Sequence, residues 1–337
     1  MKIKLLIATD DGSYAEHLSH QILEHHSDLI DVAVCKAPER LHEMLSAAVY
    51  DAALFEGQIL GDADVSMVRL PIMLSGEGEG ETALPREMAT MRKYQRISTT
   101  VADILQRYAH VSTGARGAGS EKASITAVWS PAGGVGKTTV ALAYAARKKA
   151  EGKQTLYLNL EPFSSVPAYF PQTGKSISAV FEMLENREGD VKTLIRGIRK
   201  HDSGDGVAYL CRPENFDDMN ILSVEDIHML IDACAGVTQE LVIDMSSVCD
   251  ARARKVFELS DRIFLVTDRG RATQIKLTQF CSQHNVFSRI KAKTTLVVNK
   301  GAAVFEQLAG AVVRLPYISS ADDAEVYKTL STADFGA

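Results

Sequence analysis

The segment that most restricts the fold of this 337-residue chain is a glycine-rich stretch at residues 130–139, SPAGGVGKTT. The short apolar run Ser124–Trp129 precedes it, and a long helical pattern, Val140–Lys149, follows it. A strand, a glycine-rich loop and a helix in this order form a phosphate-binding loop, because glycines let backbone N–H groups turn toward phosphate oxygens. The helix N-terminus adds partial positive charge. The sequence therefore predicts an α/β domain that binds a nucleotide.

Side chains in and beyond this loop have expected roles. Lys137 is expected to reach the β- and γ-phosphates, and the Thr138 hydroxyl is expected to ligate Mg²⁺. Asp244 follows the apolar run Leu241–Ile243 and is expected to hold the hydration shell of the ion. ATP and Mg²⁺ are the predicted cofactors. The predicted cofactor-binding residues of the loop are Gly133, Gly134, Val135, Gly136, Lys137, Thr138 and Thr139.

The length suits two domains, and a Gly/Ser/Ala-rich segment separates two apolar-patterned regions. We predict a first domain at 1–111, a linker at 112–122 and a second domain at 123–337. Residues 1–112 hold 10 Lys and Arg against 17 Asp and Glu, whereas the remainder holds 27 against 26. Neither part has the basic excess of a nucleic-acid-binding domain, so no nucleic-acid partner is expected.

Other classes of protein are excluded by composition. No run of 18 apolar residues exists, and the N-terminus lacks the pattern of a signal peptide. The five cysteines are scattered and form no CxxC pair, which is typical of a reducing cytoplasm. The tail at residues 327–337 is not a basic amphipathic helix, so no direct membrane anchor is expected.

The first domain alternates short apolar runs with helical patterns, which predicts a parallel sheet with helices on both faces. The fold class is thus α/β with two doubly wound parallel-sheet domains. The predicted strands of the first domain are 3–8, 32–35, 51–55 and 71–74, and its predicted helices are 14–25, 38–48 and 101–109.

Polar residues follow these strands in a definite order: Asp10, Asp11, Glu56, Ser75 and Lys93. The order resembles the receiver domain of response regulators, which has an acidic pair, a phosphoacceptor, a Ser/Thr and a Lys. The phosphoacceptor of that family is Asp, and Glu56 displaces the carboxylate by one methylene, while phosphoryl transfer depends on in-line positioning. We expect a pseudo-receiver that is not phosphorylated and serves as an interaction module. Solvated strand-end residues of an unrelated domain are the alternative.

The string GGVGKTT resembles the deviant Walker A loop of the ParA/MinD ATPases, and the order of motifs from residue 123 to about 335 fits that group. The resemblance implies a nucleotide site built from several strand ends. The positions it assigns are Lys137, Glu161 and Asp244 for catalysis, Thr138 and Asp244 for the metal, Asn299 and Lys300 for adenine, and Pro316 and Tyr317 for closure over the base.

Some positions depart from the ParA/MinD pattern. Pro131 replaces the first glycine of the phosphate loop, so a glycine-rich turn that binds nothing is an alternative. Ala132 replaces the signature lysine that reaches across the dimer, and Asn159 with Glu161 replaces an Asp-x-Asp pair. We therefore expect ATP hydrolysis to be weak or absent.

The domain order and the string SPxGGVG resemble the TadZ/CpaE family, which acts in assembly of Flp (tight-adherence) pili. This resemblance implies a homodimeric ATP-binding scaffold with pilus and secretion-machinery proteins as partners. It also implies a cytoplasmic protein that is recruited to the cell pole at the inner face of the membrane. The alternative is a ParA/MinD-type ATPase switch in partition or cell-division positioning. Basic clusters at 196–200 and 252–255 are interpreted as solvated helix faces.

Overall fold

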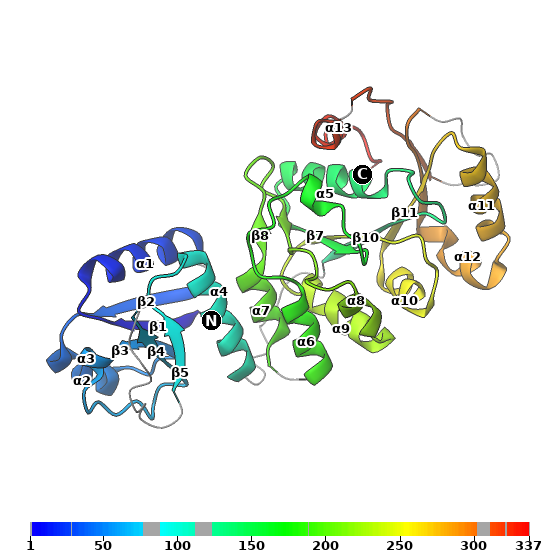
Figure 1. Ribbon diagram of the computed structural model, residues 1–337. Helices are drawn as coiled ribbons and strands as arrows, with labels where there is room; N and C mark the ends of the chain where they lie inside the picture. Colours follow the sequence, from blue (N-terminus) through cyan, green and yellow to red (C-terminus); the bar gives the residue numbers. More distant parts are fainter. Residues whose placement is uncertain are drawn as a thin grey trace. The chain divides into compact units, whose positions relative to one another are not determined.

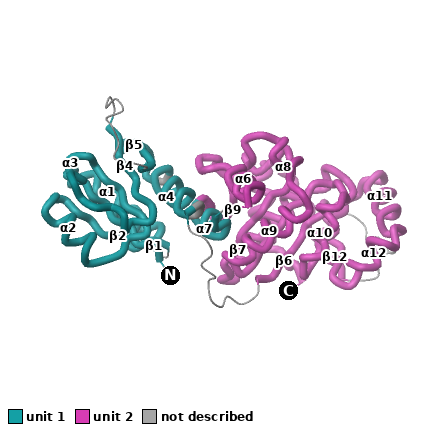
Figure 2. The backbone as a smooth tube through the Cα atoms, turned by 90° about the horizontal axis from the view of Figure 1, so that it is seen from below, with its two compact units in different colours: residues 1–117, 188–197 teal, residues 118–187, 198–337 magenta. Residues whose placement is uncertain are grey.

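A computed structural model describes residues 2–27, 29–76, 88–111, 123–187, 189–301, 311–320 and 322–336. The chain divides into two compact units, one of residues 1–117 with 188–197 and one of residues 118–187 with 198–337 (Figure 2). The predicted linker, 112–122, lies outside the described residues, so the predicted domain boundaries stay predictions. Residues 188–197 were expected in the second domain and group with the first unit instead.

The first unit contains a five-stranded parallel sheet in the order β2-β1-β3-β4-β5 (Figure 1). This is the order of flavodoxin-like doubly wound sheets, in which ligands bind beyond the carboxyl ends of the strands. Each of the four strands predicted for this domain is present, with ends shifted by one or two residues. The strands are β1 (Ile3–Ala8), β2 (Ile30–Cys35), β3 (Ala52–Glu56), β4 (Leu70–Ser75) and β5 (Ala89–Arg92).

Helices cover both faces of this sheet, and the alternation of side chains along β1 shows why. Leu5 and Ile7 belong to the core formed with α1 (Gly12–His25) and α4 (Ile97–Val111). Leu6 and Ala8 belong to the core on the opposite face, which contains residues of α2 (Pro38–Ala47) and α3 (Gly57–Leu60). Neighbouring residues of a strand point to opposite faces, so a strand buried on both sides is apolar throughout.

The second unit contains an eight-stranded sheet in the order β13-β12-β11-β6-β10-β7-β9-β8. Its pairs are parallel except for β8 with β9. The central position of β6 places the glycine-rich loop between the ends of β10 and β11 (Figure 1). The strands are β6 (Ser124–Trp129), β7 (Thr155–Leu160), β8 (Lys200–His201), β9 (Ala208–Tyr209), β10 (Glu240–Met245), β11 (Arg262–Thr267), β12 (Thr294–Val298) and β13 (Ala311–Arg314).

The helix after the glycine-rich loop, α5 (Lys137–Ala150), is buried from Val140 to Ala146 and packs with residues of β7, β10 and β11. Alanines let it approach the sheet closely, and Arg147, Lys148 and Lys149 in its last turn interact favourably with the helix dipole. The other helices of this unit, apart from two short 3₁₀ turns, are α6 (Ser178–Asn186), α8 (Asp217–Ile221), α9 (Val224–Ala235), α10 (Ala251–Leu259), α11 (Arg271–Cys281), α12 (His284–Ile290) and α13 (Asp323–Leu330).

The structure differs from the sequence predictions in two places. The apolar run 312–317 predicts a last strand, but β13 ends at Arg314, so Pro316 and Tyr317 lie beyond it. Proline has no N–H to donate to a strand ladder, which accounts for the early end. Helix α7 (Val191–Ile198) was not predicted, and it belongs largely to the first unit, where Gly197 lies against the side chain of Leu105. Across the described residues, none of the helices combines the length and apolar character that a membrane span requires.

Candidate functional site

The glycine-rich loop turns sharply between β6 and α5. Gly134 and Gly136 have φ angles of 74° and 90°, a left-handed conformation that L side chains rarely adopt. Gly136 caps α5, and its carbonyl accepts the first helical hydrogen bond, from Val140 N at 3.0 Å. Gly133 needs no such conformation and faces open space, whereas the side chain of Val135 is fully buried in the core. The backbone thus curves at the helix N-terminus, as anion binding requires.

Lys137 is held by two side chains from neighbouring strands. Its Nζ donates to Ser247 Oγ at 3.2 Å and lies 3.7 Å from Glu161 Oε1. The lysine is 7% exposed, so its ammonium group is placed inside the site rather than in bulk solvent. Glu161 was predicted here, but Ser247, which follows β10, was not. The sequence signal for Ser247 is its place three residues after Asp244, at the end of the same strand.

Asp244 is a buried carboxylate with one unsatisfied oxygen. Its Oδ2 accepts hydrogen bonds from Tyr157 Oη at 2.8 Å and Asn159 Nδ2 at 3.1 Å. Its Oδ1 is buried and accepts no hydrogen bond from the described residues. Burial raises the pKa of Asp244, against the lowering effect of the Thr138 hydroxyl, Tyr157 and Lys137. A buried carboxylate oxygen without a donor is costly.

This arrangement fits a hydrated Mg²⁺. The ion prefers oxygen ligands and keeps several of its waters, so the unsatisfied Oδ1 of Asp244 could accept a hydrogen bond from one of them. Thr138, the first residue after the loop lysine, offers a hydroxyl that is close enough to affect the pKa of Asp244. The two residues predicted at the metal therefore lie together.

Glu161 has an unusual protonation equilibrium. Burial and the charge of Asp244 raise its pKa to about 7, although Lys137 opposes the shift. Its backbone N–H donates to Asn159 Oδ1 at 3.1 Å, while Asn159 Nδ2 binds Asp244. The Asn159 amide therefore links the two carboxylate positions. A carboxylate with a pKa near the working pH can accept a proton from water.

The residues predicted to recognise adenine contact the phosphate loop itself. Asn299 Nδ2 donates to Val135 O at 2.9 Å, and Lys300 Nζ donates to Gly134 O at 2.7 Å. A side chain at Gly136 would run into Asn299 Nδ2, so glycine is required for this contact as well. Among the described residues, no donor binds Asn299 Oδ1, which stays available as an acceptor. The β12 end and the loop are thus joined.

The surroundings of four other positions in this unit bear on their predicted roles. Tyr317 is 63% exposed beyond β13, and Pro316 beside it is also exposed. Thr139 exchanges a hydrogen bond with Tyr169 at 3.1 Å, which turns it toward the core instead of toward the loop. Ala132, at the position of the signature lysine, is 4% exposed and packs in the main core. A lysine in that place would start from a buried Cβ.

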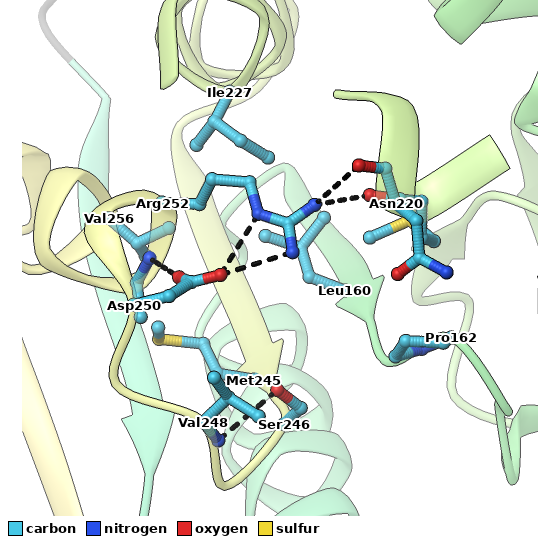
Figure 3. Close-up of a pocket in the computed structure, with 12 residues that line it drawn as sticks. Leu160, Pro162, Asn220, Ile227, Met245, Ser246, Val248, Asp250, Arg252 and Val256 are labelled. Atoms are coloured by element: carbon cyan, nitrogen blue, oxygen red, sulfur yellow. Dashed lines mark hydrogen bonds and ion pairs between the residues drawn. The ribbon is translucent and has the colours of Figure 1, made fainter. Parts of the chain in front are cut away.

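A mostly apolar pocket lies behind these strand ends (Figure 3). Leu160 and Met245 line it, while their neighbours Glu161 and Asp244 belong to the site around Lys137. Arg252 extends across the pocket, pairs with Asp250 and donates to the carbonyls of Met219 and Asn220 (Figure 3). The charge of this arginine, which belongs to the predicted basic cluster at 252–255, is therefore used inside the molecule.

The predicted strand-end residues of the first unit meet around Lys93. Its Nζ donates to Glu56 Oε1 at 2.7 Å and lies 3.3 Å from Asp11 Oδ2. Burial raises the pKa of Glu56, but hydrogen bonds from Lys93 and Thr9 outweigh it, and the net shift is downward. The buried ammonium of Lys93 thus pairs with both carboxylates and offsets part of their negative charge.

Other members of this cluster have different places. Asp10 is exposed beside Glu56, and the Ser75 hydroxyl donates to Met91 O at 3.3 Å instead of joining the cluster. Two aromatic residues that the sequence analysis did not select contribute: the Lys93 ammonium lies 5.6 Å from the ring centroid of Tyr14 and 5.2 Å from that of Tyr94. Tyrosine next to Lys93 was the one available sequence signal.

Comparison with known proteins identifies the fold of about two thirds of the chain. No family model and no curated protein matches it. Among solved structures, the ParA family ATPase from Chlorobium tepidum TLS is 16% identical, covers 64% of this chain and 94% of its own, and has a TM-score of 0.54. MinD from Pyrococcus horikoshii OT3, complexed with Mg-ADP, is 12% identical over 62% of this chain and 94% of its own, with a TM-score of 0.46. The likeness to the Chlorobium protein shows a shared ParA-type α/β fold over 64% of this chain.

Proposed function

We propose that this protein is a homodimeric ATP-binding scaffold for assembly of Flp (Tad) pili, with weak or no ATP hydrolysis. The observation that carries the nucleotide site is the buried Oδ1 of Asp244, to which no donor among the described residues bonds, together with a loop that contains two left-handed glycines. A buried carboxylate oxygen suits the water shell of Mg²⁺, and the N-terminus of α5 suits a phosphate chain. The pilus role, the partners and recruitment to the cell pole rest on the resemblance to TadZ/CpaE.

The chain's own residues perform the binding. Lys137, whose Nζ lies 3.2 Å from Ser247 Oγ and 3.7 Å from Glu161 Oε1, would leave these two groups for the phosphates. Thr138 and Asp244 would hold Mg²⁺ and its water, and Asn299 would orient the base. Bound Mg²⁺ would supply neutralisation of phosphate charge.

Weak hydrolysis follows from two features of the site. Ala132 is buried and uncharged, so the loop offers no lysine to a partner's nucleotide. Asn159 is held by Asp244 and by the Glu161 backbone, and it cannot accept a proton. These features favour a scaffold over a cycling enzyme.

One observation favours the alternative, a ParA/MinD-type ATPase switch in partition or cell-division positioning. Glu161 has a pKa raised to about 7, so near neutral pH a part of the molecules carries a carboxylate ready to accept a proton from an attacking water. Measuring phosphate release and the oligomeric state in the same samples, with and without Mg-ATP, distinguishes the scaffold from the ATPase switch.

For the first unit we propose a receiver-like interaction module that is not phosphorylated. Its strand order and the cluster of Asp11, Glu56 and Lys93 support this proposal. The Lys93 ammonium already pairs with these carboxylates and supplies one positive charge, half of what a divalent cation would bring. A protein partner is the expected ligand of this acidic unit.

The nucleotide site is tested by the variant Lys137→Ala, with Mg-ATP affinity measured by calorimetry. Loss of a charge-assisted hydrogen bond to phosphate costs about 1.5–3 kcal/mol, which raises Kd by at least about tenfold. Lys148→Ala is the matched control, because Lys148 lies on the same helix and pairs with Glu151 away from the loop. Unchanged affinity in Lys137→Ala would remove the phosphate-loop assignment.

A further inference from the structure

Two polar side chains of β7 surround the carboxylate of Asp244 in the interior of the second unit. In the parallel pairing of β7 with β10, Asn159 is the register partner of Asp244. Tyr157 lies two positions before Asn159, so both side chains lie on the face of the sheet that carries Asp244. Tyr157 is 1% exposed, and Asp244 is fully buried. Neighbouring strands therefore bring these three polar groups together away from solvent.

The hydrogen bonds of this network give each group a definite direction. Asn159 Oδ1 accepts the backbone N–H of Glu161 at 3.1 Å, which turns the amide nitrogen of Asn159 toward the other two side chains. Asn159 Nδ2 lies 3.1 Å from Tyr157 Oη and 3.1 Å from Asp244 Oδ2. Tyr157 Oη donates its own hydrogen to Asp244 Oδ2 at 2.8 Å. Two donors thus bind the same carboxylate oxygen.

The other oxygen of Asp244 has no donor among the described residues. This oxygen, Oδ1, is buried as well. Rotation of the carboxylate about its Cβ–Cγ bond would exchange the two oxygens and break both hydrogen bonds to Oδ2. In a buried site that loss is costly, because water does not replace the donors. The network therefore fixes which oxygen of Asp244 is left to accept a hydrogen bond from a ligand.

We propose that Tyr157 is a positioning residue, which holds Asp244 so that Oδ1 accepts a hydrogen bond from the water shell of nucleotide-bound Mg²⁺. The proposal rests on the nucleotide site proposed above. It adds a residue to which neither the loop motif nor the ParA/MinD resemblance gives a role. Groups that hydrogen-bond to the side chains around a metal set its affinity. A tyrosine with a purely structural role would affect stability alone.

The experiment measures the Kd of the full chain for ATP by calorimetry, once with Mg²⁺ and once with EDTA. The ratio of the Kd in EDTA to the Kd in Mg²⁺ gives the gain in affinity due to the metal, and a purely structural role leaves this ratio unchanged. Tyr157→Phe removes the hydroxyl and keeps the ring. Tyr209→Phe is the matched control, because Tyr209 is the register partner of Tyr157 on β9, is 2% exposed and donates to Pro171 O at 2.7 Å.

Tyr157→Phe is expected to lower the ratio by about tenfold, the smaller end of the effect that such partners have on metal affinity. Its Kd in EDTA should match that of the wild type, because the phosphate loop is unchanged. Tyr209→Phe should keep the wild-type ratio. Each variant loses one buried hydrogen bond, so both should melt a few degrees lower than the wild type. An equal fall of the ratio in the two variants would overturn the proposal.

The wild-type protein distinguishes failure of this proposal from failure of the site. A gain from Mg²⁺ in the wild type that persists in Tyr157→Phe would contradict the role of Tyr157 alone. Equal affinity in Mg²⁺ and EDTA would leave the phosphate loop standing but contradict the metal role of Asp244, and with it that of Tyr157. Absence of binding in both conditions would contradict the nucleotide site itself. If Tyr157→Phe fails to fold, Asn159→Ala carries the same comparison, because Asn159 supplies the second donor to Oδ2.

Discussion

Glu161 is a residue whose charge is opposed by its surroundings. It is partly buried, it lies near the buried Asp244, and the nearby cation is the Lys137 ammonium, 3.7 Å away. These surroundings keep a proton on the carboxyl in the folded state at pH values where an exposed glutamate has lost it. The folded protein therefore binds more protons than the unfolded chain between pH 4.5 and about 7.

This proton linkage predicts how stability changes with pH. Since the folded state holds the extra proton, the contribution of Glu161 is most favourable below pH 4.5 and is lost as the pH rises to about 7. Glu161→Gln should reduce the decline in melting temperature between pH 5 and pH 8 in the nucleotide-free protein. Part of the decline should remain, because the pKa of Asp244 is raised too.

Glu258→Gln serves as the control for this measurement, because Glu258 is an exposed carboxylate paired with Lys255 whose pKa is lowered instead of raised. The decline in melting temperature of Glu258→Gln between pH 5 and pH 8 should match that of the wild type. An equal decline in the wild type and Glu161→Gln would show that Glu161 ionises normally.

At this scale, sequence reasoning found the residues whose signal is local. Thr138 follows the loop lysine and Asp244 follows an apolar run, so both could be predicted as metal ligands. The structure brings the Thr138 hydroxyl close to Asp244, and their role in holding a metal stays a prediction. Tyr157 and Ser247 were missed, because their contacts join strands that are neighbours in the sheet but far apart in the chain. Nothing in a single strand reveals which residue lies across from it.

The phosphate loop requires glycine at a particular position because of its backbone conformation and its packing. Gly136 adopts φ 90° at the start of α5, and its missing side chain leaves room for the Asn299 amide. Gly133 lies in the same loop, with open space around it and no left-handed backbone. A methyl group added at Gly136 would therefore collide with Asn299, whereas one added at Gly133 would meet no neighbouring atom.

Gly136→Ala is expected to destabilise the protein by about 1–3 kcal/mol, because alanine strains the left-handed backbone and displaces Asn299. For a unit of this size, that loss lowers the melting temperature by a few degrees. Gly133→Ala, the matched control, should melt within about one degree of the wild type. Equal melting of the two variants in thermal denaturation would contradict the role given to Gly136.

Elements with a strong period were predicted well, and short or proline-limited ones were not. Strands β1, β3, β4, β6 and β10 are mainly apolar, and each begins and ends within two residues of the run that predicted it. The end of β13 was predicted three residues too late. The two-residue strands β8 and β9 carry too little pattern. Helix α7 was not predicted. Residues 188–197 group with the first unit because of tertiary contacts, and the order of residues along the chain does not reveal such contacts.

For the whole molecule, the oligomeric state and its response to nucleotide decide between scaffold and switch. The ParA/MinD resemblance implies a lysine that reaches the partner's nucleotide, and the buried Ala132 stands at that position here. We therefore expect light scattering to give a dimer both with and without Mg-ATP, and phosphate release in the same samples to stay at background. Lys137→Ala gives the background level of release.

A dimer that forms only with Mg-ATP, together with release above that background, would contradict the scaffold and favour the ATPase switch. A monomer in both conditions would contradict the homodimer in either function. The acidic balance of residues 1–112 predicts a protein partner but does not specify the surface that binds it.

The hydrogen bonds that join Asn299 and Lys300 to the phosphate loop have a kinetic consequence. They tie two segments separated by more than 160 positions into one ordered piece before any ligand arrives. A nucleotide then needs no slow loop rearrangement to enter, so its association rate approaches the limit set by diffusion and orientation. Differences in affinity among its ligands would then lie mainly in how long each remains bound.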